Sequence, residues 1–302
     1  RDDAHSETLG HYLQRERYSR AFIEQYIVPM GRAIWSATGS GMLNFPVRFF
    51  VDFFDRHGFL NIDDRPVWRT VRGGSREYVR QMARVFTRDG RVTSRVGTPV
   101  KQIRRHADRV DIIDAHGEPD HFDYVFMACH SDQTLAMLES PTHAERDVLG
   151  AFPYQPNEAI LHTDARVLPR KPLARAAWNY HLRNPDTERV CLTYDMNVLQ
   201  NIESSTRFLV TLNRDDIDPA QILGRYVYDH PVYTPQAVRA QARRAEVSGH
   251  QRSFYCGAYW RYGFHEDGVV SALWALDDFY KIAGGQRPPQ PVLEPQRRPP
   301  PA

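Results

Sequence analysis

Cysteine and lysine are scarce in this sequence. Its 302 residues contain three cysteines and three lysines, at Cys129, Cys191, Cys256, Lys101, Lys171 and Lys281. An odd number of widely separated cysteines argues against a disulfide framework and against a zinc knuckle, and it indicates a reducing compartment. We therefore expect a cytoplasmic protein, and we attribute the preference for arginine over lysine to genome composition.

Long apolar runs and a strong net charge are also lacking. No stretch approaches the roughly 20 apolar residues that span a bilayer, and no signal peptide is visible. The 39 basic and 37 acidic residues leave a formal net charge of +2, so the charge indicates neither a nucleic-acid partner nor an anionic membrane. The sequence begins at Arg1 in a polar stretch, and we expect a fragment or a processed product.

Several catalytic signatures are absent. Neither Gly39-Ser40 nor Gly74-Ser75 completes the Gly-x-Ser-x-Gly turn of a serine hydrolase, and no phosphate-binding Gly-x-x-x-x-Gly-Lys is present. Three histidines, His162, His181 and His265, lie on separate segments without the spacing of metal ligands. We therefore predict no metal site, and we find no internal repeat.

The first 72 residues predict helices. Leu9 and Phe22 each begin an apolar period, and Pro29 should kink or end the second helix. Residues 35–44 contain Gly39-Ser40-Gly41 and indicate a loop. A third helix is predicted from Val47 to His57, with Pro46 in its first turn and a stripe of phenylalanines. That stripe is typical of a core, although an apolar substrate wall is the alternative.

The middle of the chain predicts a mixture of helix and strand. Residues 61–72 form an extended connector, and Gly73-Gly74-Ser75 leads into a helix with Ser75 as its N-cap. Four short strands follow at 91–96, 100–106, 109–113 and 122–128, and then a helix at 131–138. Four more strands at 159–162, 176–181, 190–194 and 208–211 suit an antiparallel sheet. Pro235–Val247 should be helical, and residues 286–302, rich in proline, should be disordered.

The stretch from Ser253 to Ala272 combines a strand, a glycine and a helix start. The strand ends at Gly257, and apolar residues at helical spacing begin at Val269, with Glu266 and Asp267 placed as capping residues. Such a helix start presents unpaired backbone N–H groups and a partial positive charge. Gly268 lets a ligand approach that backbone closely. A capped helix after a strand, without any ligand, is the plainer interpretation.

This stretch resembles the closing segment of the FAD-dependent amine oxidase and phytoene desaturase superfamily. There a strand ends in Gly-x-x, and a later Glu-Gly or Asp-Gly opens the helix over the flavin. The run from Val96 to Ile103 is similar to the family's Val-x-x-x-x-Val-x-x-Ile, in which the middle valine, here Val100, meets the adenine. Trp178-Asn179-Tyr180-His181 and Phe264-His265-Glu266-Asp267-Gly268 resemble a bacterial group of predicted FAD-dependent oxidoreductases linked with cyclopropane fatty-acid synthases.

The resemblance implies FAD as the cofactor and a functional link to a fatty-acid-modifying enzyme. The candidate cofactor-binding residues are Val100, Gly257, Glu266, Asp267, Gly268 and Val269. Trp178, Tyr180, Trp260 and Tyr262 are candidates to line a substrate cavity, although each is also explained by packing. His265 and Glu266 are the candidate acid or base groups.

Two departures from the family pattern matter. The sequence has no Gly-x-Gly-x-x-Gly after a strand, so the first βαβ unit that holds the pyrophosphate is not found, and we expect truncation. Where amine oxidases place an acidic residue two positions after the strand-end glycine, this chain has Tyr259. That substitution puts amine oxidation itself in doubt.

The sequence thus predicts an α/β flavoprotein fold of two interleaved domains. Residues 1–72 and 153–250 would form the substrate domain, 73–152 and 251–284 the FAD domain, and 285–302 a tail. The predicted reaction is hydride transfer between flavin N5 and an apolar, lipid-like small molecule. Two alternatives stay open: a non-catalytic subunit that keeps the fold, and a lipid-binding module suggested by the phenylalanine-rich helix.

Overall fold

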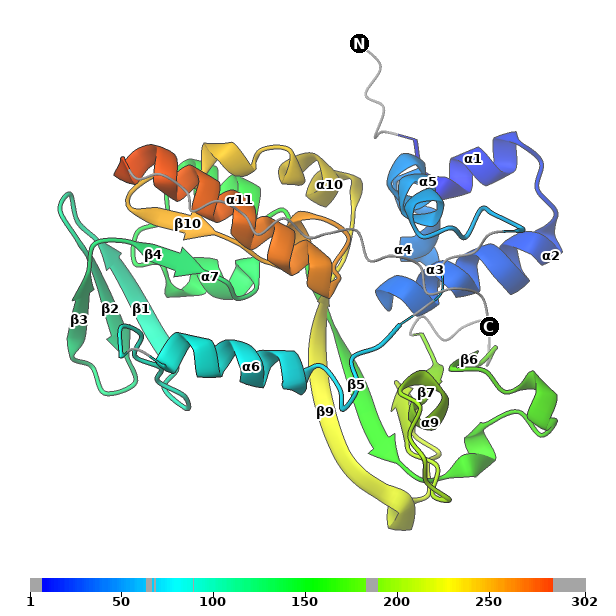
Figure 1. Cartoon of the computed structure of the whole chain (residues 1–302). Helices are drawn as coiled ribbons and strands as arrows, with labels where there is room; N and C mark the ends of the chain where they lie inside the picture. The colour runs from blue at the N-terminus through cyan, green and yellow to red at the C-terminus, as the bar shows by residue number, and fades with distance from the viewer. Residues whose placement is uncertain (1–6, 64–66, 68, 89, 183–189, 285–302) are drawn as a thin grey trace.

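The chain folds into a helical unit, a mixed α/β unit and an antiparallel sheet (Figure 1). The computed structural model describes residues 7–63, 67, 69–88, 90–182 and 190–284. The predicted tail at 286–302 lies outside these ranges. The mixed α/β architecture predicted from the sequence is confirmed, while the exact domain boundaries stay a prediction.

The helical unit comprises the first five α-helices and one π-helical turn. They are α1 (Leu9–Arg15), α2 (Arg20–Phe22), the π turn (Ile23–Ile27), α3 (Val28–Trp35), α4 (Gly39–Leu43) and α5 (Val47–Arg56). The helix does not end at Pro29, because the wider π turn precedes it and places it in the first turn of α3, where no N–H is needed. A kink at this point stays a prediction. The predicted loop at 35–44 also contains a helix, α4, because the Thr38 hydroxyl accepts the Gly41 N–H.

The phenylalanine stripe of α5 forms the core of this unit. Phe49, Phe50, Phe53 and Phe54 are all buried. The Phe53 ring stacks on Phe264 at 5.3 Å between centroids, and the Phe49 ring lies 4.7 Å from Tyr262. Pro46 occupies the N-cap position of α5 rather than its first turn. The helical unit is thus packed against the loop that precedes the last long helix.

Helix α6 (Arg76–Thr87) is twelve residues long and has no buried residue. Its apolar side is formed by Tyr78, Val79, Met82, Val85 and Phe86, which are all exposed. The predicted N-cap hydrogen bond from Ser75 is not formed, since Ser75 already has helical backbone angles. In Figure 1, α6 (cyan) runs across the molecule from the small meander to β9.

Two small sheets form the mixed α/β unit. β1 (Val100–Arg105), β2 (Val110–Asp114) and β3 (Pro119–Phe122) make an antiparallel meander, and β4 (Val125–Met127) pairs in parallel with β10 (Ser253–Tyr255). The single strand predicted at 122–128 is therefore two elements. The strand predicted at 91–96 does not form, because no neighbouring strand pairs with that segment in the described chain.

Four helices cover the parallel pair and complete its core. They are α7 (Ser131–Met137), α8 (His143–Leu149), α10 (Pro235–Gln241) and α11 (His265–Ala283). One hydrophobic cluster joins Ile103 of the meander, Met127 of β4, Leu149 of α8 and Trp260 before α11. The helix predicted at 235–247 ends at Gln241, and a 3₁₀ turn (Arg244–Glu246) follows.

A buried ion pair fastens these elements together. The Arg105 guanidinium pairs with the Glu145 carboxylate, and their side chains are 5% and 1% exposed. The hydroxyl of Tyr255 also donates to Glu145, and Arg105 Nη2 donates to the Ser140 carbonyl at 2.8 Å. The meander, α8 and the closing strand β10 are therefore joined inside the core by the polar contacts of Arg105, Glu145 and Tyr255.

The third part is the predicted antiparallel sheet, with one strand more than expected. Its order is β6 (Trp178–Tyr180), β7 (Leu192–Asp195), β8 (Leu209–Leu212), β5 (Tyr154–His162) and β9 (Ile222–Pro231), and α9 (Met196–Leu199) follows β7. Strand β9 was not predicted. The long β5–β9 ladder carries the chain from the mixed unit into this sheet.

Candidate functional site

The start of α11 is the first element of the predicted site. The helix begins at His265, one turn earlier than expected. Phe264 occupies the N-cap position, and its side chain makes no capping hydrogen bond. The buried Asp267 carboxylate accepts the Phe264 N–H at 3.0 Å and lies 3.5 Å from Arg261 Nε. Glu266 is exposed within the first turn, so its predicted capping role was wrong.

Gly268 faces open space at this helix start. A Cβ built on Gly268 would meet no atom of the described chain within 4 Å, apart from its chain neighbours and the backbone of its own helix. Val269 beside it is 54% exposed. The first-turn backbone therefore borders a space that a ligand can enter, as a close approach to a helix N-terminus requires.

The end of β10 is tied to the same helix. The Gly257 N–H donates to Ser271 Oγ at 2.8 Å, and Ser271 Oγ donates to the Gly268 carbonyl at 2.7 Å. Gly257 therefore uses its amide to hold the strand against α11, which positions Gly268 through Ser271. A contact between Gly257 and a cofactor stays a prediction, and it would have to use other atoms.

A tyrosine of α6 reaches the first residue of α11. The Tyr78 hydroxyl lies 3.0 Å from His265 Nδ1. Sequence reasoning placed Tyr78 only on the apolar side of a helix after the Gly-Gly turn. Nothing in the local sequence relates it to His265, which lies 187 positions away.

The two aromatics of the loop before α11 are part of the cores. Trp260 is 2% exposed, and its ring packs against Phe152 and Tyr259. Tyr262 contacts Phe49 and Phe53, and its carbonyl accepts the Trp35 Nε1 hydrogen at 3.2 Å. Packing explains both side chains, and their predicted place in a cavity wall has no further support in these contacts.

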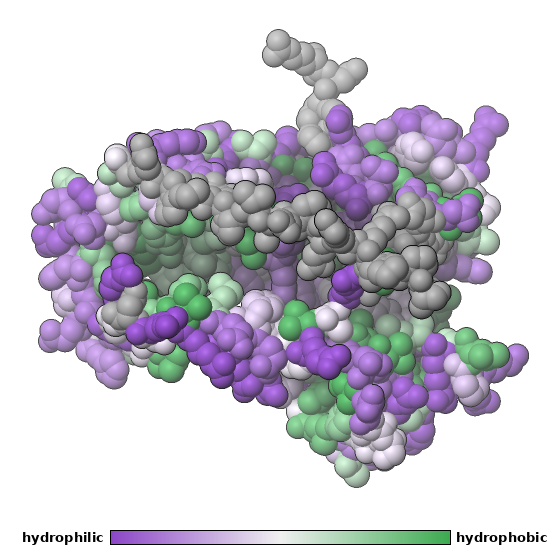
Figure 2. Space-filling model, in the orientation of Figure 1, coloured by the Kyte–Doolittle hydropathy of each residue, from purple (hydrophilic) through white to green (hydrophobic). Residues whose placement is uncertain are grey.

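Val100 lines a hydrophobic cavity of about 700 Å³ at the free edge of β4. The other walls come from the meander, β4 and α7, and include Ile112, Val125, Met127 and Met137. Figure 2 shows hydrophobic side chains gathered in a hollow above α6. The apolar side of α6 is therefore left without covering side chains in the described chain.

Trp178 and Tyr180 lie on the same face of β6, as predicted from their spacing. Tyr194 stands opposite Trp178 in the ladder, and the two rings meet edge to face at 5.4 Å. Tyr180 packs with Leu192 and with Ala33 of α3. Burial raises the pKa of Tyr194 to about 12, so its hydroxyl stays neutral at physiological pH. This face of the sheet is an aromatic wall beside α3, and the Arg32 guanidinium of α3 lies 6.0 Å from the centroid of the Tyr180 ring.

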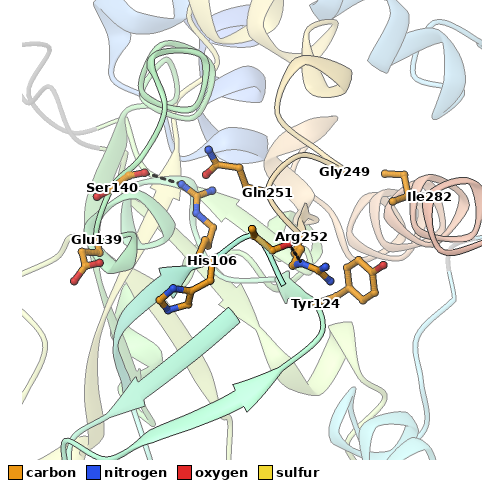
Figure 3. Close-up of a pocket in the computed structure, with 10 residues that line it drawn as sticks. His106, Tyr124, Glu139, Ser140, Gly249, Gln251, Arg252 and Ile282 are labelled. Carbon is orange, nitrogen blue, oxygen red and sulfur yellow. Dashed lines mark hydrogen bonds between the residues drawn. The ribbon is translucent and has the colours of Figure 1, made fainter. Parts of the chain in front are cut away.

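A further pocket of about 580 Å³ lies near the turn before β10 (Figure 3). Its two arginines already use protein acceptors. Arg105 pairs with Glu145, and Arg252 donates to the carbonyls of Ala107 and Asp123 at 2.9 and 3.2 Å. Both arginines of this pocket are therefore bound by protein groups and stabilise the fold.

The described residues contain no group of three or more histidine, cysteine or acidic side chains arranged to bind a metal. None of the helices in the described ranges is both long and apolar enough to cross a membrane.

Comparison with known proteins identifies the class of fold. The structure is similar to cyclohexylamine oxidase from Brevibacterium oxydans (TM-score 0.63, 12% identity, 93% of this chain and 69% of that one). It is also similar to a protein assigned as a protoporphyrinogen oxidase from Exiguobacterium sp. (TM-score 0.61, 15% identity, 89% and 67%) and to reduced UDP-galactopyranose mutase (TM-score 0.61, 13% identity, 92% and 68%). At these identities the likeness establishes the fold alone. No curated protein matches the sequence.

The sequence itself identifies the family. The chain belongs to the family of flavin containing amine oxidoreductases, whose model matches residues 1–212. FAD is accordingly the cofactor of this chain. The matched range ends before α11, and the likeness to solved structures covers 89–93% of the chain in these comparisons. The link to cyclopropane fatty-acid synthases has no support in these comparisons.

The residues present fit part of an FAD molecule. The open space at Gly268 and the amides of the α11 start suit an electron-rich ring, and the apolar cavity beside Val100 suits an adenine. The glycine-rich loop that would hold the pyrophosphate is not in the 302-residue sequence. The start of α11 and the cavity beside Val100 would thus hold the two ends of the cofactor, and the 302 residues contain no glycine-rich counterpart for its centre.

Proposed function

We propose that this chain is an FAD-dependent oxidoreductase that transfers hydride between N5 of the flavin and an apolar, lipid-like substrate. The observation that carries the proposal is the open start of α11 at Gly268, held against the closing strand by Ser271. When bound there, FAD supplies the hydride acceptor or donor. The N–H groups and the partial positive charge of the helix would stabilise negative charge on the ring.

The substrate class follows from the aromatic wall of the antiparallel sheet. Trp178, Tyr180 and Tyr194 present aromatic ring surfaces, and Tyr194 is kept neutral by burial. Such a wall favours an apolar molecule. The position two residues after the strand-end glycine, which is acidic in amine oxidases, holds the buried Tyr259 instead, and this departure argues against an amine substrate.

His265 and Glu266 are the proposed acid or base groups. His265 is held by Tyr78 through Nδ1, which leaves Nε2 as the atom that would exchange a proton. Glu266 lies exposed beside it in the same turn.

The proposal is tested by anaerobic reduction of the bound flavin. The FAD-loaded protein is mixed with an unsaturated fatty acid or with a primary amine, and the isoalloxazine absorbance is followed. Bleaching by the fatty acid but not by the amine is expected, with dithionite showing that the flavin is reducible. If dithionite bleaches the flavin but no compound in a panel of apolar candidates does, the chain is a non-catalytic subunit. Co-purified fatty acid without a chromophore would instead identify a lipid-binding module.

A further inference from the structure

The segment between β5 and β6 contains a fully exposed leucine in a basic surrounding. Leu173 is 103% exposed, at the tip of a short 3₁₀ turn (Pro172–Ala174). Residues 165–182 include four cations, Arg166, Arg170, Lys171 and Arg175, and no acidic residue. The balanced charge of the whole chain conceals this local excess.

The tip is held rigidly. Arg175 Nε donates to the Pro169 carbonyl at 3.0 Å, and the Arg175 and Ala174 N–H groups donate to the carbonyls of Pro172 and Lys171. The base of the segment is anchored by Val167 and Leu168, which are buried against Ile160 and Leu209. Leu173 is therefore presented to solvent by a closed turn, and its exposure is not that of a frayed loop.

The cations nearest the tip have no acidic partner in the described chain. Arg166 is paired with Asp164 at 2.7 Å, whereas no ion pair to Arg170 or Lys171 is found within the described ranges. Trp178 of β6 is 39% exposed and lines the same cavity as Arg166 and Arg170, so this aromatic lies beside the basic segment. Figure 2 shows hydrophobic surface bordered by hydrophilic side chains at the lower right, where Figure 1 places the segment between β5 and β6.

A protruding aliphatic side chain, a neighbouring indole and unpaired cations are the elements of a contact with an anionic bilayer. The aliphatic side chain enters the acyl boundary, the indole lies at the headgroup level, and each cation contributes about 1 kcal/mol near anionic lipid. We propose that the surface formed by Arg170, Lys171, Leu173 and Trp178 docks this protein on an anionic phospholipid membrane. The docking is peripheral, and it would place the protein beside a source of apolar substrates.

The test is vesicle co-sedimentation of the whole protein. Vesicles of phosphatidylcholine alone are compared with vesicles that also contain phosphatidylglycerol. Binding is expected to require phosphatidylglycerol. Arg170→Gln with Lys171→Gln should weaken partitioning by roughly 30-fold, and Leu173→Ser by roughly tenfold. High salt should abolish the cation contribution while leaving the effect of Leu173→Ser measurable.

Matched controls come from exposed residues elsewhere. Arg84→Gln with Arg88→Gln removes one charge from α6 and one from its C-cap, and Leu223→Ser removes an exposed leucine (56%) from β9. Both controls should bind vesicles like the unmodified protein. Equal loss in controls and patch variants, or no preference for phosphatidylglycerol, would overturn the proposal. The proposal would also be overturned if the protein bound no vesicles and light scattering showed a dimer that Leu173→Ser dissociates. FAD content, measured in parallel, should not change, which separates this outcome from a failure of the proposed oxidoreductase function.

Discussion

The hydroxyl of Tyr78 lies 3.0 Å from Nδ1 of His265, and this contact links the exposed helix α6 to the first residue of α11. Helix α6 buries none of its side chains, so few other interactions hold it in place. The contact therefore bears on both the order of α6 and the orientation of a candidate acid–base group.

Tyr78→Phe should loosen α6 while leaving the global stability nearly unchanged. An exposed hydrogen bond contributes about 1 kcal/mol or less, so the midpoint of urea unfolding should barely move. Hydrogen exchange of residues 76–87 should accelerate, because the helix lacks buried contacts that would compensate. Tyr226→Phe on β9 is the matched control, an exposed tyrosine whose ring stacks on Tyr228 of the same strand. Unchanged exchange in α6 would show that the contact does not order the helix.

Glu145→Gln should be strongly destabilising. The substitution leaves the Arg105 guanidinium buried without a counter-charge, and breaking a buried pair in this way costs about 3–5 kcal/mol. Glu139→Gln is the control, since Glu139 pairs with Arg104 at the surface and should contribute only about 0–1 kcal/mol. Urea unfolding measures both. Similar losses for the two variants would contradict the role given to burial.

Stability should fall with pH below 6.5, partly because of His162. Burial lowers the pKa of this imidazole from 6.5, so the unfolded chain binds a proton at higher pH than the folded one. The contribution of His162 is fully present above 6.5 and is lost as the pH falls toward the lower folded value. The pKa values of Asp111, Asp164 and Glu145 are lowered too, and their contributions are lost only below their own unfolded values of 3.8 to 4.5.

The free energy of unfolding should therefore slope upward between pH 4.5 and 6.5. His162→Gln should reduce that slope, although it also lowers stability at neutral pH by removing the bond from Nε2 to the Thr211 hydroxyl at 2.7 Å. His230, whose pKa is also lowered by burial, accounts for the remaining slope. His116→Gln changes an exposed histidine and should leave the slope intact. If His162→Gln leaves it intact as well, the imidazole titrates normally in the folded protein.

Local patterns were enough to predict most elements, but the pairing of strands was not visible in them. The alternation at 91–96 resembles a strand, yet no partner lies beside it in the described chain. In contrast, β9 was not predicted. Its residues Tyr226, Val227 and Tyr228 are all exposed, and their sequence does not alternate between apolar and polar side chains as in a half-buried strand. Its conformation comes from the ladder with β5, which is a long-range interaction.

The candidate site shows the same limit. The strand, the glycine and the acidic first turn of α11 could be located from local chemistry, although the helix starts at His265. The sequence could not show whether Trp260 and Tyr262 belong to the hydrophobic core or to the wall of a substrate cavity, because aromatic residues occur in both. Their contacts with Phe152 and Phe49 in the structure place them in the core. Tyr78 was not assigned to the site, because only the tertiary fold brings α6 to α11.

The measurement that tests the central claim most directly is the FAD content of Gly268→Val in the protein expressed from its natural gene. The added side chain meets no protein atom at Cβ, and valine is no worse than glycine in a helix, so thermal unfolding of the apoprotein should be unchanged. FAD affinity should fall at least roughly tenfold, about 1.4 kcal/mol, because the valine occupies the space assigned to the ring. Gly39→Val in α4 is the control, and it should retain FAD. Full FAD content in Gly268→Val would show that the start of α11 does not face the flavin.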